Sequence, residues 1–298
     1  MLLAAVLCSV LILEAAVLGL WSVSLYQQAG NPWFAVGIPL SVALGWRLSM
    51  VFSTFGMSRA WRGQSFWGAL RTTFGESLTT LYLYTLAQPL LALIPRLRVG
   101  GEGPVVVLVH GFVCNAGMWG PLQRHLQKRG FGRIYAVSLD PFYRSVPRSL
   151  AEFESKLSHI LKREDAEQAV LIGHSMGGVL ARVFRHRNSA RVKACITIGA
   201  PHSGTELSRW VSRLENGPAR PDMLWLKELN VLAHDDRRDE GVLNIWSRAD
   251  NIVYPQSNAQ LSHARDACLD GFGHLHLASA PATLNLISEF LAEHKEAS

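Results

Sequence analysis

The segment 173–178, with the sequence Gly-His-Ser-Met-Gly-Gly, constrains the fold of this chain more than any other part of it. It follows the apolar run Ala169–Ile172 and precedes a helix-like stretch, Val179–His186. This pattern predicts a strand, a tight turn and a helix, with Ser175 at the turn. The flanking glycines permit strained backbone angles and the close approach of neighbouring chain. We therefore expect the turn to present the hydroxyl of Ser175 to a cleft.

A serine hydroxyl becomes a nucleophile only when a base and an orienting acid meet it, and after such a turn they follow in the order Asp or Glu, then His. Asp250 comes just past an expected strand, Val242–Trp246. His274 falls in a loop between a short expected strand, Ala267–Leu269, and a helix-like segment, Pro281–His294. We expect His274 to take the serine proton and Asp250 to orient and stabilise the imidazole.

Other residues compete for these two roles. His276 is the rival base, but the Gly-Phe-Gly turn before His274 favours His274 as the residue laid over the serine. Asp266 and Asp270 are rival acids, although both lie too near His274 in sequence to approach it easily from another strand. His202 is open to two interpretations, as a support of its loop or as a substrate contact.

Backbone amides for a developing oxyanion are expected next to a second strand. The continuous apolar run Val105–Val109 suits a strand that is buried on both faces, and it ends in His110-Gly111-Phe112. The N–H groups of Phe112 and Met176 are the expected donors. His110 is expected to brace this loop rather than to carry a proton.

From about Pro104 to its end the chain resembles the α/β-hydrolase superfamily, and within it the bacterial lipases and esterases. The motifs that carry the resemblance are H-G-F, G-H-S-M-G-G, G-A-P-H-S-G-T at residues 199–205 and G-x-G-H. It implies a mostly parallel, doubly wound sheet with helices on both faces, and hydrolysis of carboxylic esters without a cofactor. Residue by residue, it implies a triad of Ser175, Asp250 and His274, the oxyanion-hole donors Phe112 and Met176, and the supporting residues His110, Gly111, Gly173 and Gly177.

Histidines and cysteines are present without a metal or disulfide pattern. The 11 histidines include no H-E-x-x-H or H-x-x-E-H string. The four cysteines, Cys8, Cys114, Cys195 and Cys268, are scattered and form no C-x-x-C pair. Gly-rich nucleotide loops are also missing. We expect neither a metal nor a cofactor.

The first hundred residues are unusually apolar. Residues 1–26 contain one charged residue, Glu14, and residues 33–55 contain only Arg47. Each run is long enough to cross a bilayer, which needs about 20 residues, so residues 1–58 are predicted to form a transmembrane helical hairpin. A cleaved signal peptide is the alternative for the first run, but it lacks the basic segment that such peptides carry.

Charge refines this prediction. The chain has a net charge of +6, and residues 1–100 hold six arginines against two glutamates. An excess of this kind beside apolar segments indicates anionic membrane lipid rather than nucleic acid as the partner. Arg59, Arg62 and Arg71 follow the second run. The positive-inside tendency then places the following domain in the cytoplasm, at what we expect to be a bacterial inner membrane.

The stretch 78–94 leaves this topology open. It is apolar but interrupted by threonine, glutamine and proline. It can form a third span, an interfacial helix or a helix packed on the catalytic domain, and interfacial placement is the preferred interpretation. A third span would move the catalytic domain to the periplasm.

These observations divide the chain into a transmembrane hairpin (1–58), a juxtamembrane interfacial linker (59–103) and a catalytic domain (104–298). A cap of one or two helices is expected at about 203–240, either as a cover over the acyl site or as plain scaffold. The charged run 235–240 within it is expected to be a solvated turn.

The function predicted from the sequence is that of a membrane-anchored serine hydrolase. Its substrate would be a hydrophobic carboxylic ester, cleaved through an acyl-enzyme intermediate. A thioesterase or an acyltransferase on the same triad remains an alternative, as does a non-catalytic, membrane-bound binding module. The sequence does not indicate protein partners.

Overall fold

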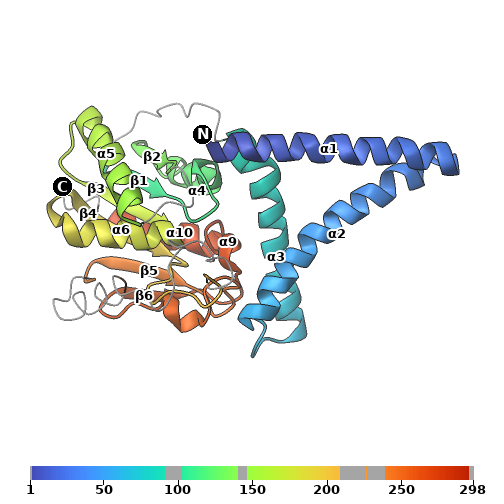
Figure 1. Ribbon diagram of the computed structural model, residues 1–298. Coiled ribbons are helices and arrows are strands. Elements are labelled where there is room, and N and C mark those ends of the chain that lie inside the picture. The colour runs from blue at the N-terminus through green and yellow to red at the C-terminus, as the bar shows by residue number, and fades with distance from the viewer. Residues whose placement is uncertain (1, 92–102, 140–145, 209–225, 227–238, 295–298) are drawn as a thin grey trace.

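The computed structural model describes residues 2–91, 103–139, 146–208, 226 and 239–294. Its centre is a six-stranded sheet in the order β2-β1-β3-β4-β5-β6, in which all neighbours are parallel (Figure 1). The strands are β1 (Val105–Val109), β2 (Ile134–Val137), β3 (Ala169–His174), β4 (Val192–Ile198), β5 (Val242–Trp246) and β6 (Arg265–Cys268).

Helices cover both faces of this sheet. One face packs on α4 (Gly120–Gln127) and α10 (Pro281–Glu293), and the other on α5 (Val146–Glu164) and α6 (Met176–Arg187). Alternate residues of β1 therefore enter two separate apolar cores, and all five are buried. A strand with no solvent-facing side reads as a continuous apolar run, which is why its sequence shows no alternation. The doubly wound parallel sheet that the sequence predicted is confirmed.

The strand order reverses at β1, which has β2 on one side and β3 on the other. In register, Val107 pairs with Tyr135 of β2 and with Leu171 of β3. The chain leaves β1 and β3 toward helices on opposite faces of the sheet, and in parallel α/β sheets such a switch point at the carboxyl ends of the strands is the usual place for a ligand site. The loop 110–112 and Ser175 both lie at this edge.

Close packing fixes α6 against the sheet. A β-carbon added to Gly177 would lie 2.3 Å from the carbonyl oxygen of Val109, and one added to Gly173 would lie 2.3 Å from the carbonyl oxygen of Gly177. Real β-carbons do not tolerate such distances. The expectation that these two glycines permit close approach at the turn is confirmed.

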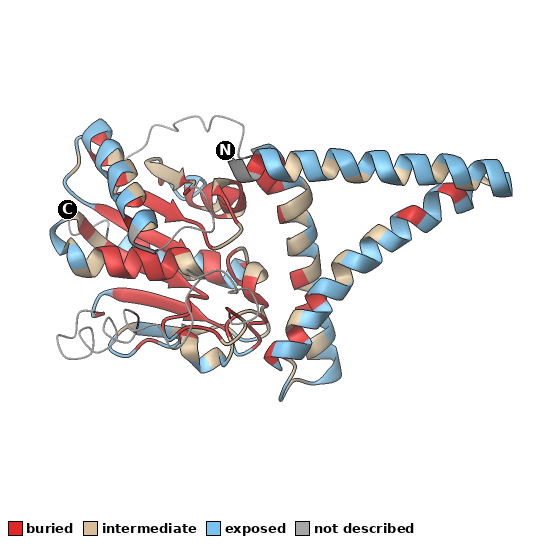
Figure 2. Cartoon of the chain, in the orientation of Figure 1, coloured by how far each residue is buried: buried red, intermediate tan, exposed pale blue. Residues whose placement is uncertain are grey.

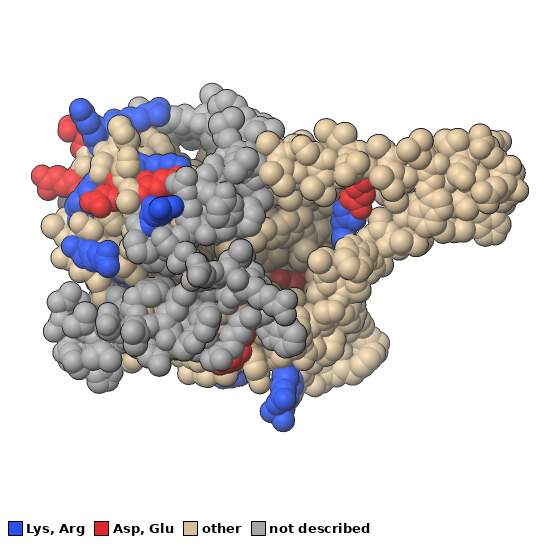
Figure 3. All heavy atoms as spheres, in the orientation of Figure 1, with Lys and Arg blue, Asp and Glu red and all other residues tan. Residues whose placement is uncertain are grey.

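The two N-terminal helices form a hairpin that projects from the body (Figure 1). They are α1 (Leu2–Ala29) and α2 (Pro32–Ser58). Both are long and apolar enough to cross a membrane, and most of their surface is exposed (Figure 2). The visible face of the hairpin is almost free of charge, whereas charged side chains gather on the body (Figure 3).

The two charged residues of the hairpin neutralise each other. Both guanidinium nitrogens of Arg47 on α2 donate to the carboxylate of Glu14 on α1, with Nη1 2.6 Å from Oε1. A bidentate pair of this kind holds two apolar helices in one register at low cost in exposed charge. The start of α1 and the end of α2 both lie beside the body, and the connecting turn lies far from it (Figure 1).

The segment after the hairpin packs on the body. It consists of α3 (Phe66–Tyr82) and a π-helical continuation, η1 (Leu83–Leu91). Leu83 and Ala87 join the core that contains Trp119. Of the three placements open for residues 78–94, packing on the catalytic domain is the one that the described residues show, while the outer side chains Leu86 and Leu90 remain exposed. Residues 92–94 lie outside the described part of the chain.

Most of the expected cap also lies outside the described residues, but one of its acidic residues corrects the sequence interpretation. Asp239 is not a solvated charge, since it is 2% exposed. Its oxygens accept hydrogen bonds from Nε and Nη2 of Arg182 at 3.0 and 2.8 Å and from Nε2 of His186 at 2.9 Å. Both partners belong to α6, and a local charge pattern cannot reveal a cation from another element.

This cluster yields a prediction for stability. Burial alone would raise the pKa of Asp239, but the hydrogen bonds from His186 and Arg182 lower it to about 2. Asp239→Asn should lower the free energy of unfolding by about 3–5 kcal/mol at neutral pH, because it leaves a buried guanidinium without its counter-charge. Urea unfolding in detergent, followed by tryptophan fluorescence, measures this change.

Asp270→Asn is the matched control, because it breaks an ion pair with Arg248 in which both side chains are at least half exposed. That pair should contribute less than about 1 kcal/mol. Equal losses in the two variants would contradict the role assigned to the buried cluster.

Candidate active site

The tight turn predicted around Ser175 joins β3 to α6. Ser175 has φ 54° and ψ −125°, a conformation that is strained for a residue with a β-carbon. Its N–H donates to the carbonyl oxygen of Ile198 at 2.8 Å, and its carbonyl oxygen accepts from the N–H of Gly178 at 2.9 Å. The turn is therefore fixed on one side by β4 and on the other by the first turn of α6.

Asp250 and His274, which lie 24 residues apart in sequence, meet at the same edge of the sheet. Asp250 follows β5, and its Oδ2 accepts a hydrogen bond from Nδ1 of His274 at 2.8 Å. Its Oδ1 accepts the N–H groups of Ile252 and Val253, each at 2.8 Å. Asp250 is 0% exposed and His274 is 4% exposed. Both carboxylate oxygens thus accept hydrogen bonds from protein groups, and neither depends on water for a partner.

His274 differs from the prediction in its local structure. It is the first residue of a short helix, α9 (His274–Leu277), rather than part of a loop. Burial lowers the pKa of its imidazole, but the charge and the hydrogen bond of Asp250, with a contribution from Glu76, outweigh burial and raise the pKa above its ordinary value. An imidazole with a raised pKa accepts a proton readily.

The residue before the serine ties the turn to His274. The ring of His174 is tilted against that of His274, with a centroid separation of 4.7 Å. Nε2–H of His174 donates to the carbonyl oxygen of His274 at 3.0 Å. Burial, followed by the nearby charge of His274, lowers the pKa of His174 to about 3, so this ring stays neutral. The structure therefore brings the segments of Ser175, Asp250 and His274 together.

The loop after β1 lies directly on the serine. A β-carbon added to Gly111 would lie 2.7 Å from the β-carbon of Ser175. His110 holds this loop, since its Nδ1–H donates to the carbonyl oxygen of Gly111 at 2.8 Å and its Nε2 accepts the N–H of Leu139 at 2.9 Å. The brace expected of His110 matches these contacts. Phe112 and Met176, the expected oxyanion donors, are backbone neighbours of this contact.

The rival acids bind elsewhere. Asp266 accepts hydrogen bonds from the Asn244 amide and from Nε1 of Trp246, and Asp270 pairs with Arg248. Both carboxylates thus support the strand β5 and the loop after it, not the ring of His274.

The two other histidines weighed from the sequence also have different surroundings. His276 lies on α9 with its ring against Phe272, at a centroid distance of 5.2 Å. His202 is buried, and its Nε2 donates to Oδ1 of Asn244 at 3.2 Å. Burial lowers the pKa of His202 to about 3. These contacts favour loop support over substrate contact for His202.

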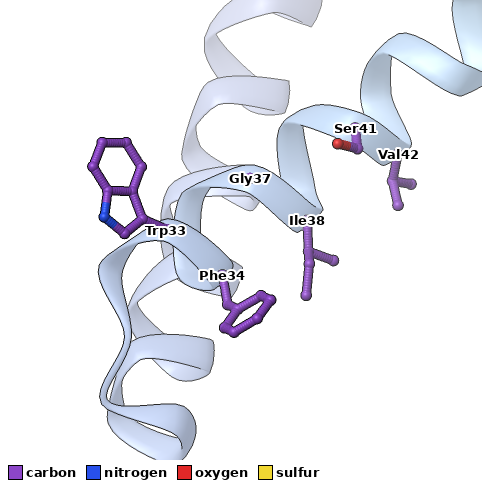
Figure 4. Close-up of a pocket in the computed structure, with 6 residues that line it drawn as sticks. All are labelled: Trp33, Phe34, Gly37, Ile38, Ser41 and Val42. Atoms are coloured by element: carbon purple, nitrogen blue, oxygen red, sulfur yellow. The ribbon is translucent and has the colours of Figure 1, made fainter.

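A hollow on the far part of α2 is a poor candidate for chemistry. Figure 4 shows that its lining comes from one stretch of this helix, with Phe34 and Ile38 projecting to the same side. The lining contains no titratable group, and it is part of the hairpin rather than of the edge that holds Ser175. Within the described ranges, no group of three or more His, Cys, Asp or Glu residues could hold a metal ion.

Two residues at the site were missed by sequence reasoning. Asn251 accepts the backbone N–H of His274 at 2.9 Å. Glu76, from α3, accepts the N–H groups of Leu275 and His276 at 3.0 and 2.9 Å. The sequence marks Glu76 only as the one carboxylate of an expected helix, and its partners on α9 become visible only in the fold.

Comparisons with known proteins agree with this geometry. A family model described as the alpha/beta hydrolase family matches residues 106–292. The chain is 32% identical over 100 residues to a pimeloyl-(acyl-carrier protein) methyl ester esterase of Vibrio campbellii, a match that covers 34% of this chain and 38% of that protein. It is 30% identical over 114 residues to the protein of the same name from Yersinia enterocolitica, covering 38% of this chain and 43% of the relative. The chain thus matches less than half the length of these curated relatives.

Solved structures show the same fold. The crystal structure of a Bacillus licheniformis lipase in its mature form matches with a TM-score of 0.53 and 17% identity, over 66% of this chain and 96% of that one. Aspergillus fumigatus lipase B matches with a TM-score of 0.53 and 16% identity, over 64% of this chain and 52% of that one. At these identities the likeness concerns the fold alone.

The buried neutral histidines predict a pH dependence of stability. His174 and His202 have pKa values of about 3 in the folded protein, below the ordinary value of about 6.5 in the unfolded chain. The unfolded chain therefore binds more protons between these values, and stability must fall as the pH falls below about 6.5. Each group should contribute about 1.4 kcal/mol per pH unit.

We expect His202→Gln to remove about half of this combined slope, because its amide N–H can still donate to Asn244 but does not titrate. The exposed His159→Gln is the control and should leave the slope as it is. Urea unfolding at several pH values measures both, and an unchanged slope in His202→Gln would be incompatible with a buried neutral imidazole.

Proposed function

We propose that this chain, which belongs to the alpha/beta hydrolase family, is a membrane-anchored serine esterase that cleaves hydrophobic carboxylic esters through an acyl-enzyme. The observation that carries the proposal is the buried hydrogen bond of 2.8 Å between Asp250 and Nδ1 of His274, beside a serine at φ 54°. The family itself and the esterases among the curated relatives support a hydrolase. The two curated relatives are methyl ester esterases, which supports a carboxylic ester as the bond that is cleaved.

In the proposed mechanism, Oγ of Ser175 attacks the ester carbonyl carbon and its proton passes to Nε2 of His274. Asp250 fixes the tautomer, because its hydrogen bond occupies Nδ1 and leaves Nε2 as the basic nitrogen. The same carboxylate stabilises the imidazolium that forms. The imidazolium then returns the proton to the leaving alkoxide, and the acyl group remains on the serine.

Deacylation repeats these steps with water as the nucleophile. His274 takes a proton from the water as the water oxygen bonds to the acyl carbon, the new oxyanion collapses and breaks the bond to Oγ of Ser175, and the imidazolium returns the proton to Oγ. In both halves the carbonyl oxygen carries a developing negative charge. The N–H groups of Phe112 and Met176 are the proposed donors to it, since the two flank the contact between Gly111 and Ser175. Removal of one such donor typically costs roughly 3–4 kcal/mol in the transition state.

Membrane anchoring is proposed from the hairpin. Two spans return the chain to the side of the bilayer on which the first span began. The proposal therefore puts the start of α1 and the catalytic domain on the same side, which agrees with the position of both ends of the hairpin beside the body (Figure 1). Arg59, Arg62 and Arg71 follow α2 on that side, which favours the cytoplasm by the positive-inside tendency. The exposed Phe66, Trp67 and Phe74 of α3 fit the lipid headgroup region. A hydrophobic acyl ester that dissolves in the bilayer is therefore the proposed substrate class.

A thioester substrate or an acyl-accepting hydroxyl other than water would use the same residues. The described site contains nothing that favours either alternative over an ester and water. A strained serine and a buried Asp–His pair both carry a folding cost, and this favours a catalytic role over a non-catalytic binding module.

Ser175→Ala should reduce turnover of p-nitrophenyl esters and of phospholipids in vesicles to background while leaving the thermal midpoint near that of the wild type. A fluorophosphonate probe should label the wild type and fail to label the variant, because the probe reacts with an activated serine. Ser158→Ala, at an exposed position on α5, is the control and should retain both labelling and turnover. Labelling that persists in Ser175→Ala would show that the nucleophile is another residue and would contradict the proposal.

A further inference from the structure

Three consecutive backbone N–H groups at the start of α9 are held by side chains from distant parts of the chain. The N–H of His274 donates to Oδ1 of Asn251 at 2.9 Å. The next two, from Leu275 and His276, donate to Oε1 and Oε2 of Glu76 at 3.0 and 2.9 Å. The backbone that carries the proposed base is therefore fixed by one amide and one carboxylate.

Glu76 reaches this position from α3, across about two hundred residues of sequence. It is 1% exposed. A β-carbon added to Gly273 would lie 2.6 Å from its Oε2, and one added to Gly75 would lie 2.4 Å from Nδ1 of His276. Thr72 adds a hydrogen bond of 3.1 Å to the carbonyl oxygen of Gly271. Helix α3 thus lies in direct contact with the whole segment that leads into the base.

The end of the hairpin holds the acid in a similar way. Nδ2 of Asn251 donates to Oγ1 of Thr54 on α2 at 2.7 Å. Nε2 of Gln256 donates both to the carbonyl oxygen of Asp250, at 2.9 Å, and to that of Ser58 at the end of α2, at 3.0 Å. On η1, the hydroxyl of Tyr84 donates to the carbonyl oxygen of Val113 in the loop after Phe112, at 3.2 Å.

We propose that Glu76 is a positioning residue of the active site, which fixes the backbone directly after His274 and contributes to the electrostatic environment of the His274 ring. The helical segment that contains it is then part of the catalytic frame and not a detachable tether. This inference rests on the proposed function in so far as His274 is the base.

The charge of Glu76 acts on His274 together with a small set of neighbours. Asp250 contacts the ring directly, and the neutral ring of His174 packs against it. Burial raises the pKa of Glu76 above its ordinary value, and the N–H groups of His276 and Leu275, together with the charge of His274, offset only part of this rise. His276, beside Arg71, and the phenol of Tyr84 are the other titratable groups near this carboxylate. Of these groups, Asp250 and Glu76 both raise the pKa of His274.

Glu76→Gln is the test in the full-length protein in detergent. The amide retains the shape but loses the charge, and it offers only one acceptor to two N–H groups. We expect kcat for a p-nitrophenyl ester to fall on the order of tenfold to a hundredfold with little change in KM, as expected for a base that is misplaced by a fraction of an ångström. The acid limb of the pH profile of kcat/KM should move to lower pH, because loss of a negative charge lowers the pKa of His274.

Glu164→Gln is the matched control. Glu164 is also a buried carboxylate, but it binds Arg133 and Tyr135 at the end of α5, away from α9. This variant should lower the thermal midpoint without moving the acid limb. Glu76→Asp, which keeps the charge on a shorter side chain, should lower kcat and leave the acid limb closer to that of the wild type, and it also serves if Glu76→Gln does not fold.

An NMR titration of His274 separates this inference from the proposed function, because it does not require turnover. Glu76→Gln should lower the pKa of the His274 ring, and an unchanged pKa would overturn the inference. A lack of ester turnover in the wild type would contradict the proposed function, whereas the titration would still decide the role of Glu76. The inference would also be overturned if folded Glu76→Gln had the kcat of the wild type and an unshifted acid limb.

Discussion

The Asp250 carboxylate and the His274 imidazole share a hydrogen bond in a place that water does not reach. A carboxylate in such surroundings is costly unless each oxygen has partners, and Asp250 meets this condition through two backbone N–H groups and one ring nitrogen. The condition is met because β5 and β6 are parallel neighbours, so the segments that follow them come to the same edge of the sheet as the turn after β3.

The same constraint explains why the N-terminal segment is packed so closely on the body. The first N–H groups of α9 have no acceptor within their own helix, and α3 supplies acceptors through Glu76. The end of α2 stabilises the acid loop through Thr54 and Ser58. The hairpin and the geometry of the site are thus parts of one structure, in which the hairpin leads directly into the elements that support the acid and the base.

Much of the fold and of the candidate site could be predicted from sequence because the signals are local. The apolar run of β1 and the turn at Ser175 depend on neighbouring residues, and the order of Asp250 and His274 follows from strand ends at one edge. Glu76, Asn251 and Asp239 could not be assigned in this way, since each has a partner that only the folded topology brings near. The segment 78–94 was ambiguous for a related reason, because its mixture of apolar and polar residues suits a lipid surface and a protein surface equally well.

The structure of the full-length protein after reaction with a long-chain alkyl phosphonate would test the central claim most directly. The account predicts phosphorus bonded to Oγ of Ser175, the phosphoryl oxygen within hydrogen-bond distance of the N–H groups of Phe112 and Met176, and Nε2 of His274 facing the ester oxygen. The Asp250 and Glu76 contacts with the His274 segment should be unchanged in that structure. A phosphonate on another residue, or an imidazole of His274 turned away from the adduct, would contradict it.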